Sequence, residues 1–137
     1  MRVVLDANAI LPTRAHQYDA GLDLYSPVDA LIPPRGSYDI DSGVHVEIPV
    51  GCVGMIRSKS GLLFKHSITT DGTIDAGYTG SVRVKMLNHT DQYYQVKRGD
   101  KITQIVVQPC MLPEIEVVDS LDDTERGANG FGSTDNK

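Results

Sequence analysis

Val82-Arg83-Val84-Lys85-Met86 places an apolar side chain at every second position, with a charged side chain between each pair. Because successive side chains of a β-strand point to opposite faces of its sheet, this alternation predicts a strand with one buried face and one solvated face. Val44-His45-Val46-Glu47-Ile48 repeats the pattern. Two runs rich in β-branched residues and bounded by glycine or proline, Ile102–Val107 and Ile115–Val118, predict further strands.

Glycine and proline divide the rest of the chain into short segments. The 13 glycines and 7 prolines are spread over all 137 residues, so few windows can hold a helix. Pro33–Gly36 and Pro49–Gly51 predict turns, and Ser60–His66 predicts one short helix with Ser60 in position to cap it. Many short strands separated by turns are typical of an all-β fold, either a barrel or a sandwich.

Composition and charge limit the classes of function. The chain is 40% apolar and 23% charged, which is ordinary for one globular domain of this length. Its net charge of −5 argues against holding nucleic acid through phosphates.

Asp6 interrupts the short apolar run at the start, and no stretch approaches the ~20 apolar residues that cross a membrane. Cys52 and Cys110 form neither a disulfide framework nor a metal motif. We therefore expect a soluble cytoplasmic protein that binds neither nucleic acid nor a membrane.

The end of the chain is polar and rich in glycine. This composition predicts a flexible arm over residues 119–137, following a β-domain over residues 1–118. Within the arm, the Arg126 guanidinium suits phosphate oxygens, and the glycines that follow it can turn backbone N–H groups toward an anion. Phe131 is a lone aromatic in these polar surroundings, as in a lid over a nucleotide. A terminus with accidental glycines is the alternative.

Two segments before the arm combine polar groups with glycines. Gly72–Gly80 predicts a tight hairpin that brings its backbone close to a ligand, and it carries Asp75 and Tyr78. A carboxylate in a site can orient and deprotonate a water, although an aspartate that caps a turn is the alternative. Arg57–Leu62 places cations, hydroxyls and a glycine before the short helix, a pattern that holds phosphates in some proteins and only caps a surface helix in others.

Two polar residues interrupt apolar strands. Asp23 lies among apolar neighbours in Ala20–Tyr25, where a carboxylate is costly unless it is paired or hydrogen-bonded. Gln104 interrupts the apolar part of Gly99–Ile105, so its amide points either to solvent or into a site.

Taken together, these five segments resemble, in order and spacing, the five motifs of the trimeric deoxyuridine triphosphate nucleotidohydrolases, or dUTPases. The matching segments are AGLDLYS, SKSGL, GTIDAGYTG, GDKITQIV and RGANGFGST, which span Ala20 to Thr134. The resemblance implies a jelly-roll-like β-barrel, a homotrimer with sites shared between subunits, and hydrolysis of dUTP to dUMP and pyrophosphate with Mg²⁺. Such a reaction keeps uracil out of DNA and supplies dUMP for thymidylate synthesis.

The resemblance also implies a role for each candidate residue. Asp75 and Gln104 would hold the water that attacks the α-phosphorus, and Tyr78 would pack beneath the sugar and exclude a 2′-hydroxyl. Asp23 would act on Mg²⁺ through water, since the family metal is held mainly by the triphosphate itself. The other implied substrate-binding residues are Gly72, Thr73 and Ile74 at the uracil, Lys59, Ser60 and Gly61 at the phosphates, and Arg126, Phe131, Gly132, Ser133 and Thr134 in the arm.

The sequence departs from the family pattern at Lys59, where the family usually has arginine, so one phosphate contact loses the guanidinium fork. A dCTP deaminase is one alternative, because it shares the fold, but its glutamate base corresponds here to Lys85, which cannot serve as that base. A trimeric module that binds without hydrolysis is a second alternative, against which Asp75 argues. A third is an additional protein partner bound through Asp91–Gly99, where Tyr93 and Tyr94 are adjacent.

Overall fold

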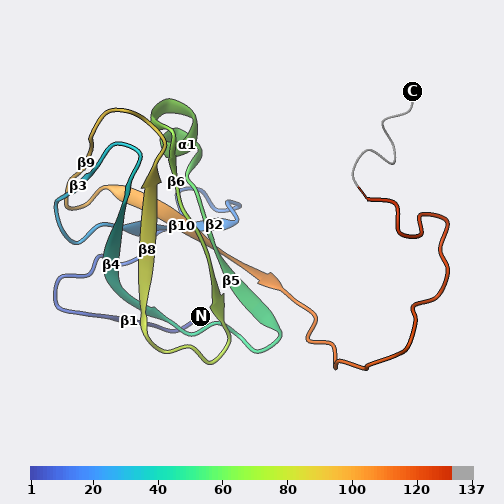
Figure 1. The fold of residues 1–137 in the computed structure, drawn as a ribbon. Helices are drawn as coiled ribbons and strands as arrows, with labels where there is room; N and C mark the ends of the chain where they lie inside the picture. Colours follow the sequence, from blue (N-terminus) through green and yellow to red (C-terminus); the bar gives the residue numbers. More distant parts are fainter. Residues whose placement is uncertain (131–137) are drawn as a thin grey trace.

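The computed structural model describes residues 1–130, which form short strands and one helix (Figure 1). Helix α1 (Ser60–His66) lies between β5 and β6 in the chain. The strands are β1 (Val3–Leu5), β2 (Gly21–Tyr25), β3 (Ala30–Ile32), β4 (Ser37–Val46), β5 (Cys52–Arg57), β6 (Ile68–Thr69), β7 (Asp71–Asp75), β8 (Ser81–Asn88), β9 (Tyr94–Val96) and β10 (Lys101–Pro109).

The strands pair into two four-stranded sheets with the orders β1-β4-β8-β6 and β2-β10-β5-β7, and into a small β3-β9 pair. Every named pairing is antiparallel. The predicted all-β, jelly-roll-like fold is confirmed. Within residues 1–130, however, the strands form separate sheets and do not close into a barrel.

The core lies where the apolar faces of the two large sheets meet. In β8 the apolar positions Val82, Val84 and Met86 are buried, and the charged positions between them are exposed, as the alternation predicts. Leu24 from β2 and Ile105 from β10 contribute fully buried side chains from the other sheet. Burial of these faces fixes the register of the strands that carry the candidate site.

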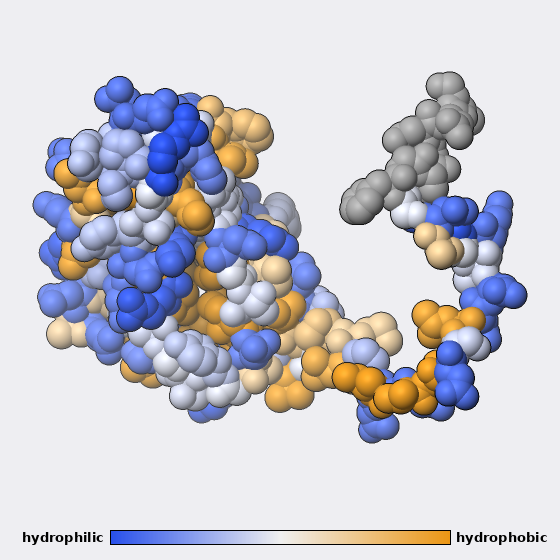
Figure 2. Space-filling view, in the orientation of Figure 1, coloured by the Kyte–Doolittle hydropathy of each residue, from blue (hydrophilic) through white to orange (hydrophobic). Residues whose placement is uncertain are grey.

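The strand predicted over Ile115–Val118 is wrong. Residues 110–130 contain no strand or helix, and after β10 this segment runs away from the sheets (Figure 1). The side chains of Ile115 and Val117 are 95% and 93% exposed, and Figure 2 shows apolar surface along this segment. A β-branched run favours an extended backbone, but a strand also needs a neighbour to pair with, and within residues 1–130 none lies beside it.

Helix α1 begins at the predicted residue, but its cap differs from the expectation. Lys59 occupies the N-cap position with an extended backbone, Ser60 is the first helical residue, and no side chain caps the helix. Ser67 ends the helix in the left-handed conformation, with its N–H bonded to the last turn. Among residues 1–130, no helix is long and apolar enough to cross a membrane.

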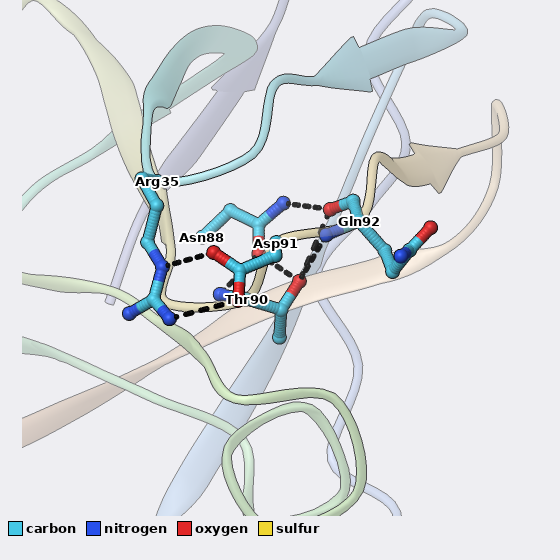
Figure 3. A network of polar contacts seen from close by, with 5 residues as sticks. All are labelled: Arg35, Asn88, Thr90, Asp91 and Gln92. Carbon is cyan, nitrogen blue, oxygen red and sulfur yellow. Dashed lines mark hydrogen bonds and ion pairs between the residues drawn. The ribbon is translucent and has the colours of Figure 1, made fainter.

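A polar network ties the turn before β4 to the loop after β8 (Figure 3). The buried Asn88 amide donates to the carbonyl of Gln92 at 2.7 Å, and its oxygen accepts from the Thr90 hydroxyl at 2.8 Å. The Arg35 guanidinium donates through Nε and Nη2 to both carboxylate oxygens of Asp91 at 2.8 and 3.1 Å. This ion pair is exposed at the surface.

The adjacent tyrosines of the 91–99 segment differ in their surroundings. Tyr93 is exposed, whereas Tyr94 is half-buried with its ring 5.1 Å from that of His66. A protein partner for this segment stays a prediction.

Candidate functional site

A pocket of about 220 Å³ lies against β7 and the first half of β8. It brings together the residues predicted in the Gly72–Gly80 segment, and adds side chains from β5 and β8 that were not predicted to belong to a site. Its lining is Gly72, Thr73, Ile74, Asp75 and Tyr78, with Ile56, Ser81, Val82 and Arg83. We call this the β7 pocket.

The predicted hairpin at this pocket is wrong, since β7 and β8 belong to different sheets. β7 pairs with β5, whereas β8 pairs with β4 and β6, so residues 76–80 connect the two sheets. The apolar side chains of β8 are buried in the core, and its backbone pairs with β4 and β6 instead of β7. β7 is therefore an edge strand, and its outer edge presents backbone N–H and C=O groups.

The Tyr78 ring is held beside the pocket by its own turn. A Cβ on Gly80 would lie 2.3 Å from the Tyr78 hydroxyl, so only glycine there lets the ring pack this closely. The hydroxyl donates to the Ser81 carbonyl at 3.1 Å, and the Tyr78 N–H donates to the Asp75 carbonyl at 3.2 Å. These contacts fix the aromatic ring relative to the backbone of Asp75 and Ser81.

His45 on β4, which the sequence did not indicate as a functional residue, supports the same turn. Its Nδ1 lies 2.8 Å from the Thr79 carbonyl and its Nε2 lies 3.3 Å from the Asp6 carboxylate. The hydrogen bond to Thr79, together with Asp6, raises the pKa of His45 above its ordinary value. Because Asp6, His45 and Thr79 are far apart in sequence, spacing could not have revealed this contact.

A second pocket, of about 350 Å³, lies on the sheet that also contains β7, among β2, β10 and the end of β5. It gathers residues from three predicted segments, Ala20–Tyr25, Arg57–Leu62 and Gly99–Ile105, and adds the charged side chain of Asp19. The lining residues are Asp23, Lys59 and Gln104, with Ala15, Asp19, Ala20, Gly21, Arg57 and Val106. We call this the β10 pocket.

Asp23 is buried, with 4% of its surface exposed, and it is paired as the sequence requires. One carboxylate oxygen accepts from the Lys59 ammonium, and the other lies 2.7 Å from the Lys101 ammonium. Burial opposes ionisation, but the hydrogen bonds from Lys101 and Lys59 outweigh it and lower the pKa of Asp23 below its ordinary value. Asp23 thus holds Lys59 at the β10 pocket and also binds Lys101.

Gln104 faces the β10 pocket rather than open solvent. Its Nε2 donates to the Ser58 carbonyl at 3.2 Å, and its side chain is half-buried. The other end of the amide lies over Gly21, where a Cβ would be only 2.1 Å from Oε1. The absence of a side chain at Gly21 therefore makes room for the Gln104 side chain.

The structure separates the two residues predicted to be catalytic. Gln104 pairs with Arg57 at one end of β5, whereas Asp75 pairs with Val53, near the other end of β5. Four residues along a strand and two strand spacings across the sheet place Asp75 and Gln104 roughly 15 Å apart. Hydrogen bonds reach only about 3 Å, so the two side chains of one chain cannot hold the same water.

The remaining predicted residues lie apart from both pockets or outside the described residues. Ser60 and Gly61 begin α1, directly after Lys59. Arg126 is exposed in the segment after β10, where its Nε donates to the Asn129 carbonyl at 3.1 Å. The structure describes nothing beyond residue 130, so four predicted residues lie outside it, namely Phe131, Gly132, Ser133 and Thr134.

The donor groups give one test of the expected Mg²⁺. Within residues 1–130, no three His, Cys, Asp or Glu side chains come together as a metal site. Both Asp23 oxygens are engaged by lysine ammonium groups. This arrangement fits a metal whose ligands come mainly from a bound triphosphate, with at most a water-mediated contact from the chain.

Comparisons with known proteins find similar sequences and a similar fold. A family model described as dUTPase matches residues 7–135. A deoxyuridine 5′-triphosphate nucleotidohydrolase of Gloeothece citriformis is 45% identical over 133 residues, which is 95% of this chain and 92% of that protein. The solved dUTPase of Staphylococcus bacteriophage 80alpha with dUpNHpp superposes with a TM-score of 0.91 at 31% identity, covering 97% of this chain and 96% of that chain. A point mutant of the dUTPase from phage phi11 of S. aureus, described with a structural Mg(II) ion, superposes with a TM-score of 0.81 at 30% identity and covers 87% and 96% of the two chains.

Proposed function

The chain belongs to the dUTPase family, and on that premise we propose how it hydrolyses dUTP to dUMP and pyrophosphate. The observation that carries the proposal is the β7 pocket, where the predicted residues from Gly72 to Tyr78 meet around one space. The backbone of Gly72–Ile74 lies on an edge strand, so its N–H and C=O groups can pair with the edge of uracil. Tyr78 would lie beneath the deoxyribose and leave no room for a 2′-hydroxyl.

The β10 pocket would take the triphosphate. Lys59 offers an ammonium with three donor positions, of which Asp23 occupies one. Ser60 and Gly61 follow it directly and would add a hydroxyl and a backbone N–H. Because the chain carries a net charge of −5, binding a triphosphate depends on cations concentrated at one place.

The reaction requires alignment more than covalent chemistry from the protein. We propose that the Asp75 carboxylate orients a water in line with the α-phosphorus and accepts its proton. Gln104 would donate to or accept from the same water through its amide. The new P–O bond forms as the bond to the bridging oxygen breaks, and pyrophosphate leaves.

A homotrimer would bring these groups together. Since Asp75 and Gln104 of one chain are roughly 15 Å apart, we infer that one subunit supplies the β7 pocket and another supplies the β10 pocket. The exposed apolar side chains after β10 offer a surface that a neighbouring subunit would cover. They are Met111, Leu112, Ile115, Val117, Val118 and Leu121.

We infer that Mg²⁺ enters with the triphosphate. When bound, the ion would neutralise phosphate charge and polarise the phosphoryl oxygens. Asp23 is the residue that would contact its water shell, while also holding Lys59 and Lys101 in place.

Residues 119–137 would act as an arm that closes the site. Arg126, Ser133 and Thr134 would bind the outer phosphates, and Phe131 would cover the uracil, with Gly132 between them in the chain. Residues 1–118 would form the β-domain beneath it. A cytoplasmic location stays a prediction from the sequence.

A parallel substrate assay tests this proposal. Pyrophosphate release is measured with dUTP, dCTP, dTTP and UTP, and we expect release from dUTP alone. A deaminase would instead convert dCTP, but Lys85 on the outer face of β8 lies 3.8 Å from Asp39 and offers no base. A binding module would bind dUTP without releasing pyrophosphate, and that result would overturn the proposal.

A further inference from the structure

One row of paired residues crosses all four strands of the second sheet at the β10 pocket. Asp23 on β2 pairs with Gln104 on β10, Gln104 pairs with Arg57 on β5, and Arg57 pairs with Asp71 on β7. Directly paired residues of antiparallel strands point to the same face of the sheet. Arg57 therefore projects beside Gln104, one strand spacing of about 5 Å away, and it lines the same pocket.

The partner of Arg57 lies at the surface. Its Nη1 donates to the Asp71 carboxylate at 3.1 Å, and the two side chains are 51% and 76% exposed. Exposed ion pairs of this kind contribute little to stability, because water solvates both charges well. Arg57 can thus exchange the Asp71 carboxylate for another anion at small cost.

Lys59 is held differently. Its ammonium pairs with Asp23, a buried carboxylate that leaves its partner little freedom to move. Lysine is also a point charge, whereas arginine presents a planar fork that binds two phosphate oxygens at once. Of the cations that line the β10 pocket among residues 1–130, Arg57 alone has this fork.

The charge of the pocket gives a further reason for exchange. Asp19 and Asp23 balance Arg57 and Lys59 among its lining residues, and the Asp71 carboxylate in addition neutralises the Arg57 guanidinium while the two are paired. Release of Asp71 toward solvent would leave the guanidinium charge for the phosphates.

We infer that Arg57 is a substrate-binding residue, which releases Asp71 and binds phosphate oxygens of the triphosphate through its guanidinium. The inference rests on the proposed function, since it takes the β10 pocket as the triphosphate site. Arg57 would supply the planar guanidinium that Lys59 lacks. A triphosphate offers this group outer phosphate oxygens that a monophosphate does not have.

The test compares Arg57→Gln, Arg57→Lys and Asp71→Asn with the wild type in the full-length protein. Affinity for dUpNHpp and for dUMP is measured by calorimetry with Mg²⁺, and KM and kcat are measured with dUTP. A charge-assisted contact of ordinary strength predicts that Arg57→Gln weakens dUpNHpp about tenfold or more. We expect dUMP affinity and kcat to change much less, Arg57→Lys to be intermediate, and Asp71→Asn to tighten dUpNHpp.

Arg35→Gln is the matched control, because it breaks an Arg–Asp pair of similar exposure, 65% and 78%, away from both pockets (Figure 3). We expect it to leave dUpNHpp affinity unchanged. Unchanged affinity in Arg57→Gln would overturn the inference. Equal weakening by Asp71→Asn would also overturn it, because the ion pair would then be structural. Wild-type protein that releases no pyrophosphate from dUTP would contradict the proposed function instead, and the dUpNHpp comparison would still test Arg57.

Discussion

Asp75 and Gln104 lie on opposite edges of β5 and are four residues apart along it, because Asp75 pairs with Val53 and Gln104 pairs with Arg57. Two inactive variants should therefore complement each other. When Asp75→Asn and Gln104→Ala chains are unfolded together and refolded in equal amounts, random assembly gives about a quarter of all sites both intact residues, each from a different subunit. We expect activity near that fraction. The same chains refolded separately and then mixed are the control, and an inactive mixed trimer would contradict a shared site.

Asp75→Asn should retain binding and lose turnover. Asparagine keeps the size of the side chain but cannot accept a proton from water, so we expect kcat to fall about 10²- to 10⁴-fold. Affinity for dUpNHpp should stay near that of the wild type. Asp91→Asn, which changes an exposed carboxylate in the loop after β8, is the control for turnover. Normal turnover in Asp75→Asn would remove Asp75 from the mechanism.

A charge placed in the apolar segment after β10 should prevent assembly. Val117→Asp puts a carboxylate where we expect a neighbouring subunit to cover the chain, and an unpaired buried charge is strongly unfavourable. Light scattering should then show smaller species than for the wild type. Glu114→Gln, in the same segment but without an added charge, should leave the assembly unchanged. A trimer in Val117→Asp would place the interface elsewhere.

Truncation after Glu125 should leave the fold and the assembly intact but severely reduce turnover. The removed residues include Arg126, which would contact the outer phosphates. Such a contact is worth roughly 1.5–3 kcal/mol, and base stacking on Phe131 about 1–3 kcal/mol. Affinity for dUTP should fall more than affinity for dUMP, which lacks the outer phosphates. Equal loss for both nucleotides would argue that the arm contacts only the base.

The contribution of His45 to stability should depend on pH. The Thr79 carbonyl and the Asp6 carboxylate are both acceptors, so only the protonated imidazole can donate to both. Since the pKa of His45 in the folded state is raised above 6.5, its contribution is complete below that pH and is lost as the pH rises through the raised value. Urea unfolding of wild type and His45→Gln should therefore differ at low pH and converge at high pH. A constant difference would exclude titration of His45 as its origin.

The strands of the core could be predicted because alternation reflects a local property of the chain. Val82, Val84 and Met86 point one way in any extended backbone, and burial of that face follows. Pairing of Asp23 could be predicted as well, because an unpaired carboxylate among apolar neighbours is too costly. Its partner Lys101 could not be identified, because residues so distant in sequence meet only when the strands take their register.

The errors have the same physical origin. Ile115–Val118 has the composition of a strand, but whether it pairs depends on what lies beside it in space. The segment from Gly72 to Gly80 has the glycines of a hairpin, but β8 pairs with β4 in the other sheet. Sequence order brought Asp75 and Gln104 into one expected site, and only the register along β5 shows their separation.

The outer edge of β7 offers main-chain atoms, which every amino acid except proline provides in the same form. Discrimination between bases that relies on those atoms would tolerate most point mutations at positions 72 and 73, whereas Ile74 is buried in the core. Selectivity for uracil would then persist when exposed side chains of this strand are substituted. A change of base preference would demand a shift of the strand itself, which the exchange of one exposed side chain does not provide.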